Sequence, residues 1–493
     1  MAKKSLGGVA LPRKKWGVLA YIVAEPPPGF SGAQDLNPNA HAEVQAIAQA
    51  GDALQPFMHV AYQVDYGDKV GIFRQIVDGP TPDVVRVDEP PDAEAGDPTV
   101  LTNFFQWAIK ECPAERYAVF FWGHSFGPAS MFAPPLPGLR VLGLPELRGA
   151  LSSFRKNGQE LDVVLFKDCW MSTLETACEL QDVARFVVAS QALVPIASVW
   201  PYEDLFTDLA VGKSASECAL VTTLGKFYDK PENRVPDDAV PFALLDLRKV
   251  DRVSDALNGL VDSLREVGTE DRRRAIEHAS IADIALADVR TLCANLQRAC
   301  SPRTAAAAAQ SLDAAVNDLV VHQYAQIPGF RGVSVFYYPS QERRNSPDGG
   351  RIIWPLLPFS RYATFRLGKE TEWKQVAFEQ LRPVKSPTQP VQSLTRMEHA
   401  MPNRRLPGNF GPKIDDFGPK IDDFGPVISA HNAFIDALRI ALGDSALTQL
   451  TTLSTGDTSG ALVGVITELM TNIQALDKSV TRLSQLIEAK SLI

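Results

Sequence analysis

Two hydrophobic patterns alternate along the chain between residues 16 and 191. Continuous apolar runs of strand length occur at residues 16–25, 58–68, 70–79, 117–124, 161–169 and 184–191. Between these runs, apolar residues recur with helical spacing over residues 39–51, 97–113, 142–158 and 172–182. Strands that are apolar on both faces and alternate with helices are typical of a mainly parallel sheet covered by helices. We therefore expect an α/β fold, built as an α/β/α sandwich.

After residue 203 the pattern becomes largely helical up to residue 330. Residues 251–268 and the alanine-rich residues 303–325 are the longest predicted helices, and residues 330–339 predict one more strand. Residues 362–381 end the globular part. We place a first domain at residues 14–382.

Residues 383–428 differ in composition from the sequence before them. Prolines are frequent, and FGPKIDD occurs twice in succession before a third FGP, over residues 410–426. A Gly-Pro pair every seven residues prevents a helix or a central strand. We expect a semi-extended, solvated linker here.

The last segment, residues 429–493, is predicted to be helical. Its apolar positions alternate in spacings of four and three, which indicates the seam of a supercoiled helix. The positions are Leu462, Ile466, Leu469, Ile473, Leu476, Val480, Leu483 and Ile487. The segment either packs on the first domain as a helical hairpin or binds another helix. We favour self-association or a protein partner.

Composition restricts the class of protein. The net charge of −9 argues against nucleic acid as the main partner. No apolar run approaches the ~20 residues that span a membrane, and we recognise no signal peptide near the start. The 6 cysteines form no CxxC pair, which is typical of reduced thiols in the cytoplasm. We therefore expect a cytoplasmic protein that binds neither nucleic acid nor membrane.

Two predicted strands end on residues that can react chemically, one at His124 and the other at Cys169. Sites in open α/β sheets gather at the carboxyl ends of parallel strands. A nearby imidazole favours the thiolate, and so does the N-terminus of a following helix, which we expect at Met171 or Ser172. His124 can then protonate a leaving group. The backbone N–H groups of Cys169 and Ser125 are candidate donors to an oxyanion.

A simpler interpretation of each residue stays open at this point. A single cysteine after a strand is usually a small buried apolar residue. A lone histidine more often makes a structural hydrogen bond than takes part in catalysis. Spacing alone does not decide between these interpretations.

Three segments resemble the clostripain family of cysteine peptidases. Residues 115–130, ERYAVFFWGHSFGPAS, resemble its histidine motif. Residues 162–191 resemble its cysteine motif, Phe-Asp-Ala-Cys-Leu-Met followed by a helix that contains Glu, and VWPY at residues 199–202 resembles a Gly-Trp-Pro-Tyr element. The opening strand at residues 14–25 and three later segments, at residues 240–260, 280–296 and 332–339, resemble further family elements in the same order, so the resemblance extends over about residues 14–380. It implies a caspase-like fold in which Cys169 is the nucleophile and His124 its acid–base partner.

The resemblance also implies a substrate pocket, and there the chain departs from the family. Relatives have an Asp two residues before the cysteine, which pairs with a basic P1 side chain, whereas this chain has Lys167. We expect an acidic or neutral P1 residue, unless a carboxylate neutralises Lys167. Asp168 is adjacent, but neighbours on a strand point to opposite faces. Ser190, Trp200 and Tyr202 are further pocket candidates, and the two aromatic residues have the core as an alternative.

Three other positions carry expectations of their own. Ser125 replaces a glycine of the family, and its N–H can serve as a donor if the backbone angles allow a Cβ. Ala24-Glu25-Pro26 replaces an Ala-Asp-Asn segment, so calcium, which the resemblance implies, has no support in the sequence; we expect no cofactor and no metal site. Glu175 is expected to be a solvated or helix-capping carboxylate.

We therefore expect an intracellular cysteine endopeptidase that cleaves a protein or peptide substrate through a Cys–His dyad. A partner, oligomerisation or self-processing is expected to activate it, an arrangement that suits a bacterial stress or defence pathway. The alternative is a catalytically silent caspase-like scaffold or signalling adaptor. A third hypothesis is a dyad enzyme that acts on a non-peptide acyl group.

Overall fold

The computed structural model describes most of the predicted first domain. The described residues are 11–24, 36–67, 71–77, 85–86, 96–132, 142–196, 198–211, 216–233, 240–281, 284–299, 303–324, 327–340 and 357–381. The predicted linker (383–428) and the predicted C-terminal helices (429–493) lie outside these residues.

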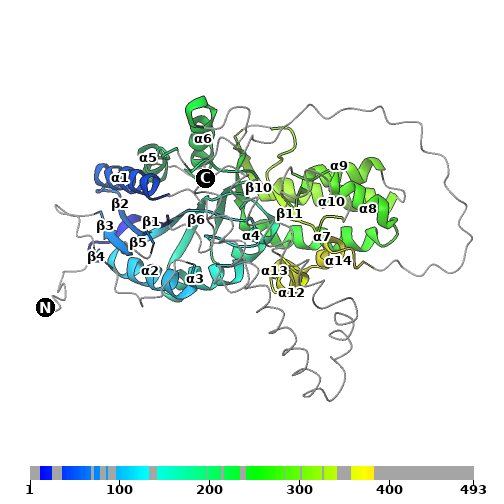
Figure 1. Ribbon diagram of the computed structural model, residues 1–493, viewed down its shortest axis with the longest axis horizontal. Helices are drawn as coiled ribbons and strands as arrows, with labels where there is room; N and C mark the ends of the chain where they lie inside the picture. Colours follow the sequence, from blue (N-terminus) through cyan, green and yellow to red (C-terminus); the bar gives the residue numbers. More distant parts are fainter. Residues whose placement is uncertain are drawn as a thin grey trace, which may run out of the picture. The chain divides into compact units, whose positions relative to one another are not determined.

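A nine-stranded sheet forms the centre of the described structure (Figure 1). Its strands, in spatial order, are β10 (Val320–Gln323), β8 (Phe242–Asp246), β7 (Phe186–Ser190), β6 (Glu160–Lys167), β5 (Ala114–Trp122), β1 (Lys14–Val23), β2 (Met58–Asp65), β3 (Ile72–Ile76) and β4 (Val85–Arg86). The five strands from β7 to β2 pair in parallel, and the strands at both edges pair antiparallel. The sheet is thus parallel at its centre, as the alternating pattern predicts.

Helices cover both faces of this sheet (Figure 1). One face is covered by α1 (Asn37–Ala53), α5 (Tyr202–Val211) and α6 (Ser216–Asp229), and the other by α2 (Pro98–Glu111), α3 (Leu144–Lys156) and α4 (Leu174–Leu180). Alternate side chains of β5 enter the two buried clusters, so that Phe120 lies on the first face and Phe121 on the second. Burial on both faces explains why the strands are continuous apolar runs.

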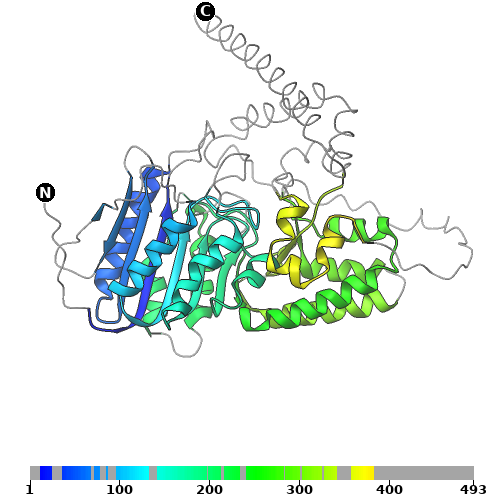
Figure 2. The same cartoon turned by 90° about the horizontal axis from the view of Figure 1, so that it is seen from below.

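The chain after β8 adds a second group of helices, green in Figure 2. These are α7 (Val250–Leu264), α8 (Thr269–Glu277), α9 (Val289–Ala299) and α10 (Arg303–Leu319). A separate antiparallel pair, β9 (Leu286–Asp288) and β11 (Ser334–Phe336), follows from the same region. Short helices complete the described elements: the 3-10 turns Pro231–Asn233 and Leu247–Lys249, α12 (Phe359–Tyr362), α13 (Arg366–Glu370) and α14 (Trp373–Ala377).

The helical prediction for residues 203–330 needs a correction. This stretch contains β8, β9 and β10, and β10 begins where the predicted helix 303–325 was expected to continue. Val320 and Val321 are β-branched, and β10 pairs antiparallel with β8. Pairing with a distant strand therefore overrides the local helical pattern. The predicted strand at 330–339 is reduced to β11.

None of the described helices is both long and apolar enough to cross a membrane.

Candidate active site

The sheet brings His124 and Cys169 to the same edge. β5 and β6 are parallel neighbours, and their last paired residues are Trp122 and Lys167. Each candidate lies two residues beyond its strand. The Ser125 hydroxyl, directly after the histidine, donates a hydrogen bond to the carbonyl oxygen of Cys169. Register and hydrogen bond together hold the two loops side by side, so the predicted pair is brought together.

The turn after Cys169 is set by unusual backbone geometry. Trp170 adopts a left-handed conformation with φ of 57°, and α4 begins only at Leu174. The cap is Thr173, whose side chain accepts a hydrogen bond from the Thr176 N–H. The expected helix start at 171 or 172 is therefore wrong, because the positive φ at position 170 redirects the chain first. The influence of a helix N-terminus fades within one turn, so α4 gives Cys169 little help.

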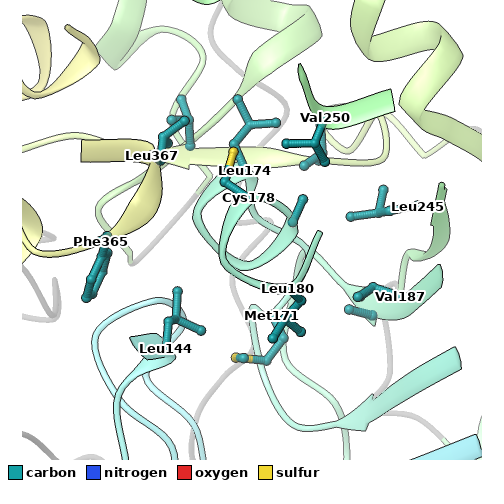
Figure 3. Packing of buried hydrophobic residues seen from close by; sticks show 14 of the residues in the cluster. Leu144, Met171, Leu174, Cys178, Leu180, Val187, Leu245, Val250, Phe365 and Leu367 are labelled. Atoms are coloured by element: carbon teal, nitrogen blue, oxygen red, sulfur yellow. The ribbon is translucent and has the colours of Figure 1, made fainter. Parts of the chain in front are cut away.

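Apolar packing anchors this turn and the short helix behind it. Figure 3 shows the side chains of Met171, Leu174, Cys178 and Leu180 in one buried cluster. Their labelled neighbours come from five other parts of the chain: Leu144, Val187, Leu245, Val250, Phe365 and Leu367. Residues far along the sequence thus support the position of the turn after Cys169.

Cys169 is buried in this structure, with 8% of its surface exposed. The N–H of Val194 donates a hydrogen bond to Sγ at 3.4 Å. Burial raises the pKa of the Cys169 thiol to about 12, the Val194 N–H opposes this rise, and the charge of Asp168 adds to it. Burial also lowers the pKa of His124 to about 4. Burial thus favours the neutral thiol of Cys169 and the neutral imidazole of His124.

The backbone angles at Ser125 allow a Cβ, which is the condition under which its N–H can serve as a donor. The described non-glycine residues with a positive φ are Phe132, Trp170 and Glu379, so Ser125 holds its Cβ without strain. In the described part of the chain, the N–H groups of Ser125 and Cys169 donate no hydrogen bond. Their role as donors to an oxyanion stays a prediction.

Lys167, the last residue of β6, is buried and is not exposed to solvent. Its side chain is 1% exposed and contacts the carboxylate of Glu43 on α1. Its Nζ also donates to the Ser198 carbonyl at 2.6 Å and lies 5.7 Å from the centre of the Trp200 ring. The condition attached to the pocket prediction is thus met by a carboxylate, Glu43. No local pattern predicts this ion pair, because 124 positions separate the two residues.

The other three predicted pocket residues are buried in the structure. Ser190 accepts a hydrogen bond from the Ala192 N–H at 3.0 Å. The Trp200 indole donates to the Tyr228 hydroxyl at 2.8 Å, and Tyr202 belongs to the same buried cluster. The structure thus gives the two aromatic residues core contacts, and their role in a pocket stays a prediction.

Asp168 is fully buried, and neither carboxylate oxygen has a hydrogen-bond partner in the described structure. Burial raises its pKa well above the ordinary value of an aspartate. Burial therefore favours the neutral acid form of Asp168 next to Cys169, and only its ionised form adds to the pKa of the thiol.

The prediction that Glu175 is a solvated carboxylate is wrong. Its side chain is fully buried in the first turn of α4. One carboxylate oxygen accepts hydrogen bonds from the Phe336 N–H at 2.9 Å and from the Tyr362 hydroxyl at 2.8 Å. Burial raises the pKa of Glu175 to about 7, against the effect of these two bonds. Residues of β11 and α12 pack against Glu175 and exclude the solvent that its place in the sequence predicts.

Among the described residues, no group of three or more His, Cys, Asp or Glu side chains is arranged to hold a metal ion.

The model of the clostripain family matches residues 58–329. The chain belongs to the clostripain family. It is therefore a cysteine-type peptidase, and the predictions of family and enzyme class are confirmed. Among curated proteins, none matches the chain significantly.

Solved structures confirm the caspase-like fold of this clostripain family member. A secreted C11 cysteine protease from Bacteroides thetaiotaomicron, in complex with an irreversible peptide inhibitor, has a TM-score of 0.50 and 17% identity, and the match covers 74% of this chain and 99% of that one. An inactive zymogen C11 protease from Parabacteroides distasonis has a TM-score of 0.52 and 16% identity, with the same coverage of 74% and 99%.

Proposed function

We propose that this peptidase cleaves peptide bonds with Cys169 as nucleophile and His124 as acid–base partner. The observation that carries the proposal is the pairing of Trp122 with Lys167, which puts both residues just beyond neighbouring strand ends. The hydrogen bond from Ser125 to the Cys169 carbonyl supports it. Family membership favours this function over a silent scaffold and over a non-peptide acyl substrate.

The reaction follows from these positions. The sulfur of Cys169 attacks the carbonyl carbon of the scissile bond, and its proton passes to His124. The N–H groups of Ser125 and Cys169 stabilise the negative oxygen of the tetrahedral intermediate. His124 then gives its proton to the departing amine, which leaves a thioester on Cys169. Water, activated by His124, hydrolyses the thioester and frees the enzyme.

We further propose that the resting chain has low activity, because its dyad is uncharged. A thiol whose pKa is about 12 and an imidazole whose pKa is about 4 do not form the thiolate–imidazolium pair that attacks. Activation must therefore bring water or substrate dipoles to the dyad. The candidate triggers of activation are binding of a partner, oligomerisation and self-processing.

The preferred P1 residue is proposed to be neutral. The resemblance to the family assigns position 167 to the pocket, and Glu43 cancels the charge of Lys167 there. A cation held in an internal pair attracts an acidic side chain weakly, yet it still disfavours Arg or Lys.

Self-association or partner binding through residues 429–493 remains a proposal that rests on the heptad spacing. Sedimentation of the full chain tests it at several concentrations. A cytoplasmic location is also proposed, supported by the free thiols of Cys169, Cys178, Cys218 and Cys293.

Covalent labelling tests the nucleophile directly. An irreversible, thiol-reactive peptide probe is incubated with the protein, and the labelled residue is identified by mass spectrometry. We expect one label, on Cys169, which is lost in Cys169→Ala and strongly slowed in His124→Ala. Cys178→Ala is the matched control, because Cys178 is another buried thiol, and it should label normally. Equal labelling of His124→Ala would remove the histidine from the mechanism.

A further inference from the structure

The segment after β7 is bonded to the turn that carries the nucleophile. The Trp170 N–H donates to the Ala192 carbonyl at 3.1 Å, and the Ser172 N–H donates to the Ser190 carbonyl at 3.0 Å. These backbone bonds connect the residues just after Cys169 to the last residue of β7 and to Ala192 just beyond it. The two segments therefore move as one unit.

The same segment reaches the sulfur itself. Three residues after Gln191, the N–H of Val194 donates to Sγ of Cys169 at 3.4 Å. A hydrogen bond from a backbone amide stabilises the thiolate relative to the thiol. The position of Val194 therefore affects the chemistry of the nucleophile, and whatever fixes this segment acts on catalysis.

The side chain of Gln191 holds this segment in place through hydrogen bonds. Its side chain is fully buried, and both ends of its amide are hydrogen-bonded. Nε2 donates to Asp288 Oδ2 at 3.0 Å and to the Ser334 hydroxyl at 2.8 Å, and Oε1 accepts from the Gly332 N–H at 2.6 Å. Asp288 and Ser334 lie 97 and 143 positions further along the chain. The catalytic segment is thus tied to β9 and β11.

Asp288 is in turn held rigidly. It is fully buried at the end of β9. One of its carboxylate oxygens accepts from the Thr291 N–H at 2.7 Å, and the other accepts from Gln191 and from the Arg331 N–H at 2.7 Å. A buried polar network whose members are all bonded fixes geometry closely. Asp288 therefore gives Gln191 one orientation only.

We propose that Gln191 and Asp288 are positioning residues of the peptidase: their buried network holds residues 191–194 so that the Val194 N–H stays on the sulfur of Cys169. The proposal rests on Cys169 being the nucleophile. Neither side chain touches the reacting atoms, and both act through the backbone between positions 191 and 194.

Steady-state kinetics on a cleaved peptide, normalised by titration of active sites with the irreversible probe, test the proposal. In Gln191→Ala we expect kcat per titrated site to fall about 10- to 100-fold while KM changes little, because a displacement of about 1 Å costs that much. Asp246→Asn is the matched control, since Asp246 is a buried carboxylate at the end of β8, and it should keep kcat per site.

Gln191→Glu separates positioning from simple loss of stability. It puts a carboxylate oxygen where Nε2 now lies 3.0 Å from Asp288. Two carboxylates at that distance repel unless they share a proton. Activity relative to wild type should therefore recover as the pH falls from 8 to about 5, whereas Gln191→Ala should show no such recovery. A flat ratio for Gln191→Glu contradicts the proposal.

Hydrogen–deuterium exchange gives a readout that needs no activity. In Gln191→Ala, amides of residues 191–194 should exchange at least about tenfold faster, with little change in β1 or β5. Unchanged exchange in this segment overturns the proposal. Full activity in Cys169→Ala instead overturns the nucleophile assignment and leaves the exchange result standing, so the two failures are distinguishable.

Discussion

At the scale of single residues, side chains that are distant in the sequence surround Cys169 and His124. Cys169 and His124 stand at the ends of apolar runs, which is a local signal. Glu43 and Gln191 depend on partners about a hundred positions away, which no local pattern reveals. Asp168 was considered only as a partner of Lys167, whereas in the structure it has no hydrogen-bond partner in the described residues. The chemistry of the site is therefore set partly by distant side chains.

Replacement of Asp168 by Ala should stabilise the protein. A buried polar group without a hydrogen bond costs about 1–3 kcal/mol, so its removal should raise the free energy of unfolding by about that amount. The gain should be larger at high pH. Burial raises the pKa of Asp168, so ionisation of this side chain at high pH destabilises the folded wild-type protein. Urea denaturation at pH 6 and pH 8 measures this.

The control for Asp168 is Asp162→Ala. Asp162 is also a buried carboxylate, but it accepts a hydrogen bond from Arg116 at 2.7 Å. This variant should lose stability. Loss of stability in both variants would show that Asp168 has a partner.

Replacement of Glu43 by Gln should change the P1 preference. Burial already lowers the pKa of Lys167, and the variant also removes its carboxylate partner, so Lys167 should carry its proton only at acid pH. At about pH 6, cleavage after Asp or Glu should therefore rise about tenfold relative to cleavage after neutral residues, which corresponds to about 1.4 kcal/mol. The melting temperature should fall, because a buried lysine loses its ion-pair partner. A peptide library compares the variant with wild type and with Glu160→Gln, a change at the exposed start of β6. An unchanged profile would remove Lys167 from the pocket.

At the scale of elements, strands and helices with clear periodicity formed as expected, and tertiary pairing decided the rest. Asp97 caps α2, with its side chain accepting from the Thr99 N–H at 2.7 Å, at the start of the predicted helix 97–113. β8 and β10 were not expected, because each is short and is stabilised by its neighbour rather than by its own pattern. The late start of α4 follows from the turn at Trp170, which periodicity does not report.

Glu175 should make the anchoring of α4 depend on pH. Its pKa is about 7 in the folded protein and about 4.5 when unfolded, so folding favours the protonated form. The resulting stability is complete below pH 4.5 and is lost as the pH rises through 7, by about 3 kcal/mol in all. Glu175→Gln, which carries no ionisable group, should abolish this loss.

Chemical denaturation of wild type and Glu175→Gln between pH 5 and pH 8 measures the difference. Glu270→Gln, a change on the exposed side of α8, should leave the wild-type dependence intact. Parallel curves for wild type and Glu175→Gln would mean that Glu175 does not titrate in this range.

At the scale of the whole molecule, the sheet positions the two candidate residues, and the later part of the chain packs against the turn after Cys169. β11 bonds directly to this turn, since the Ser334 N–H donates to the Ser172 carbonyl at 3.0 Å. Phe336, the last residue of β11, donates its N–H to the carboxylate of Glu175. Elements far along the chain therefore stabilise the turn after Cys169 and the start of α4.

The cleavage profile of the purified protein on a mixed peptide library tests the central claim most directly, with Cys169→Ala and His124→Ala measured beside it. The account predicts cleavage after neutral residues that disappears in Cys169→Ala and falls by at least about a hundredfold in His124→Ala. Cleavage that persists in Cys169→Ala would contradict it.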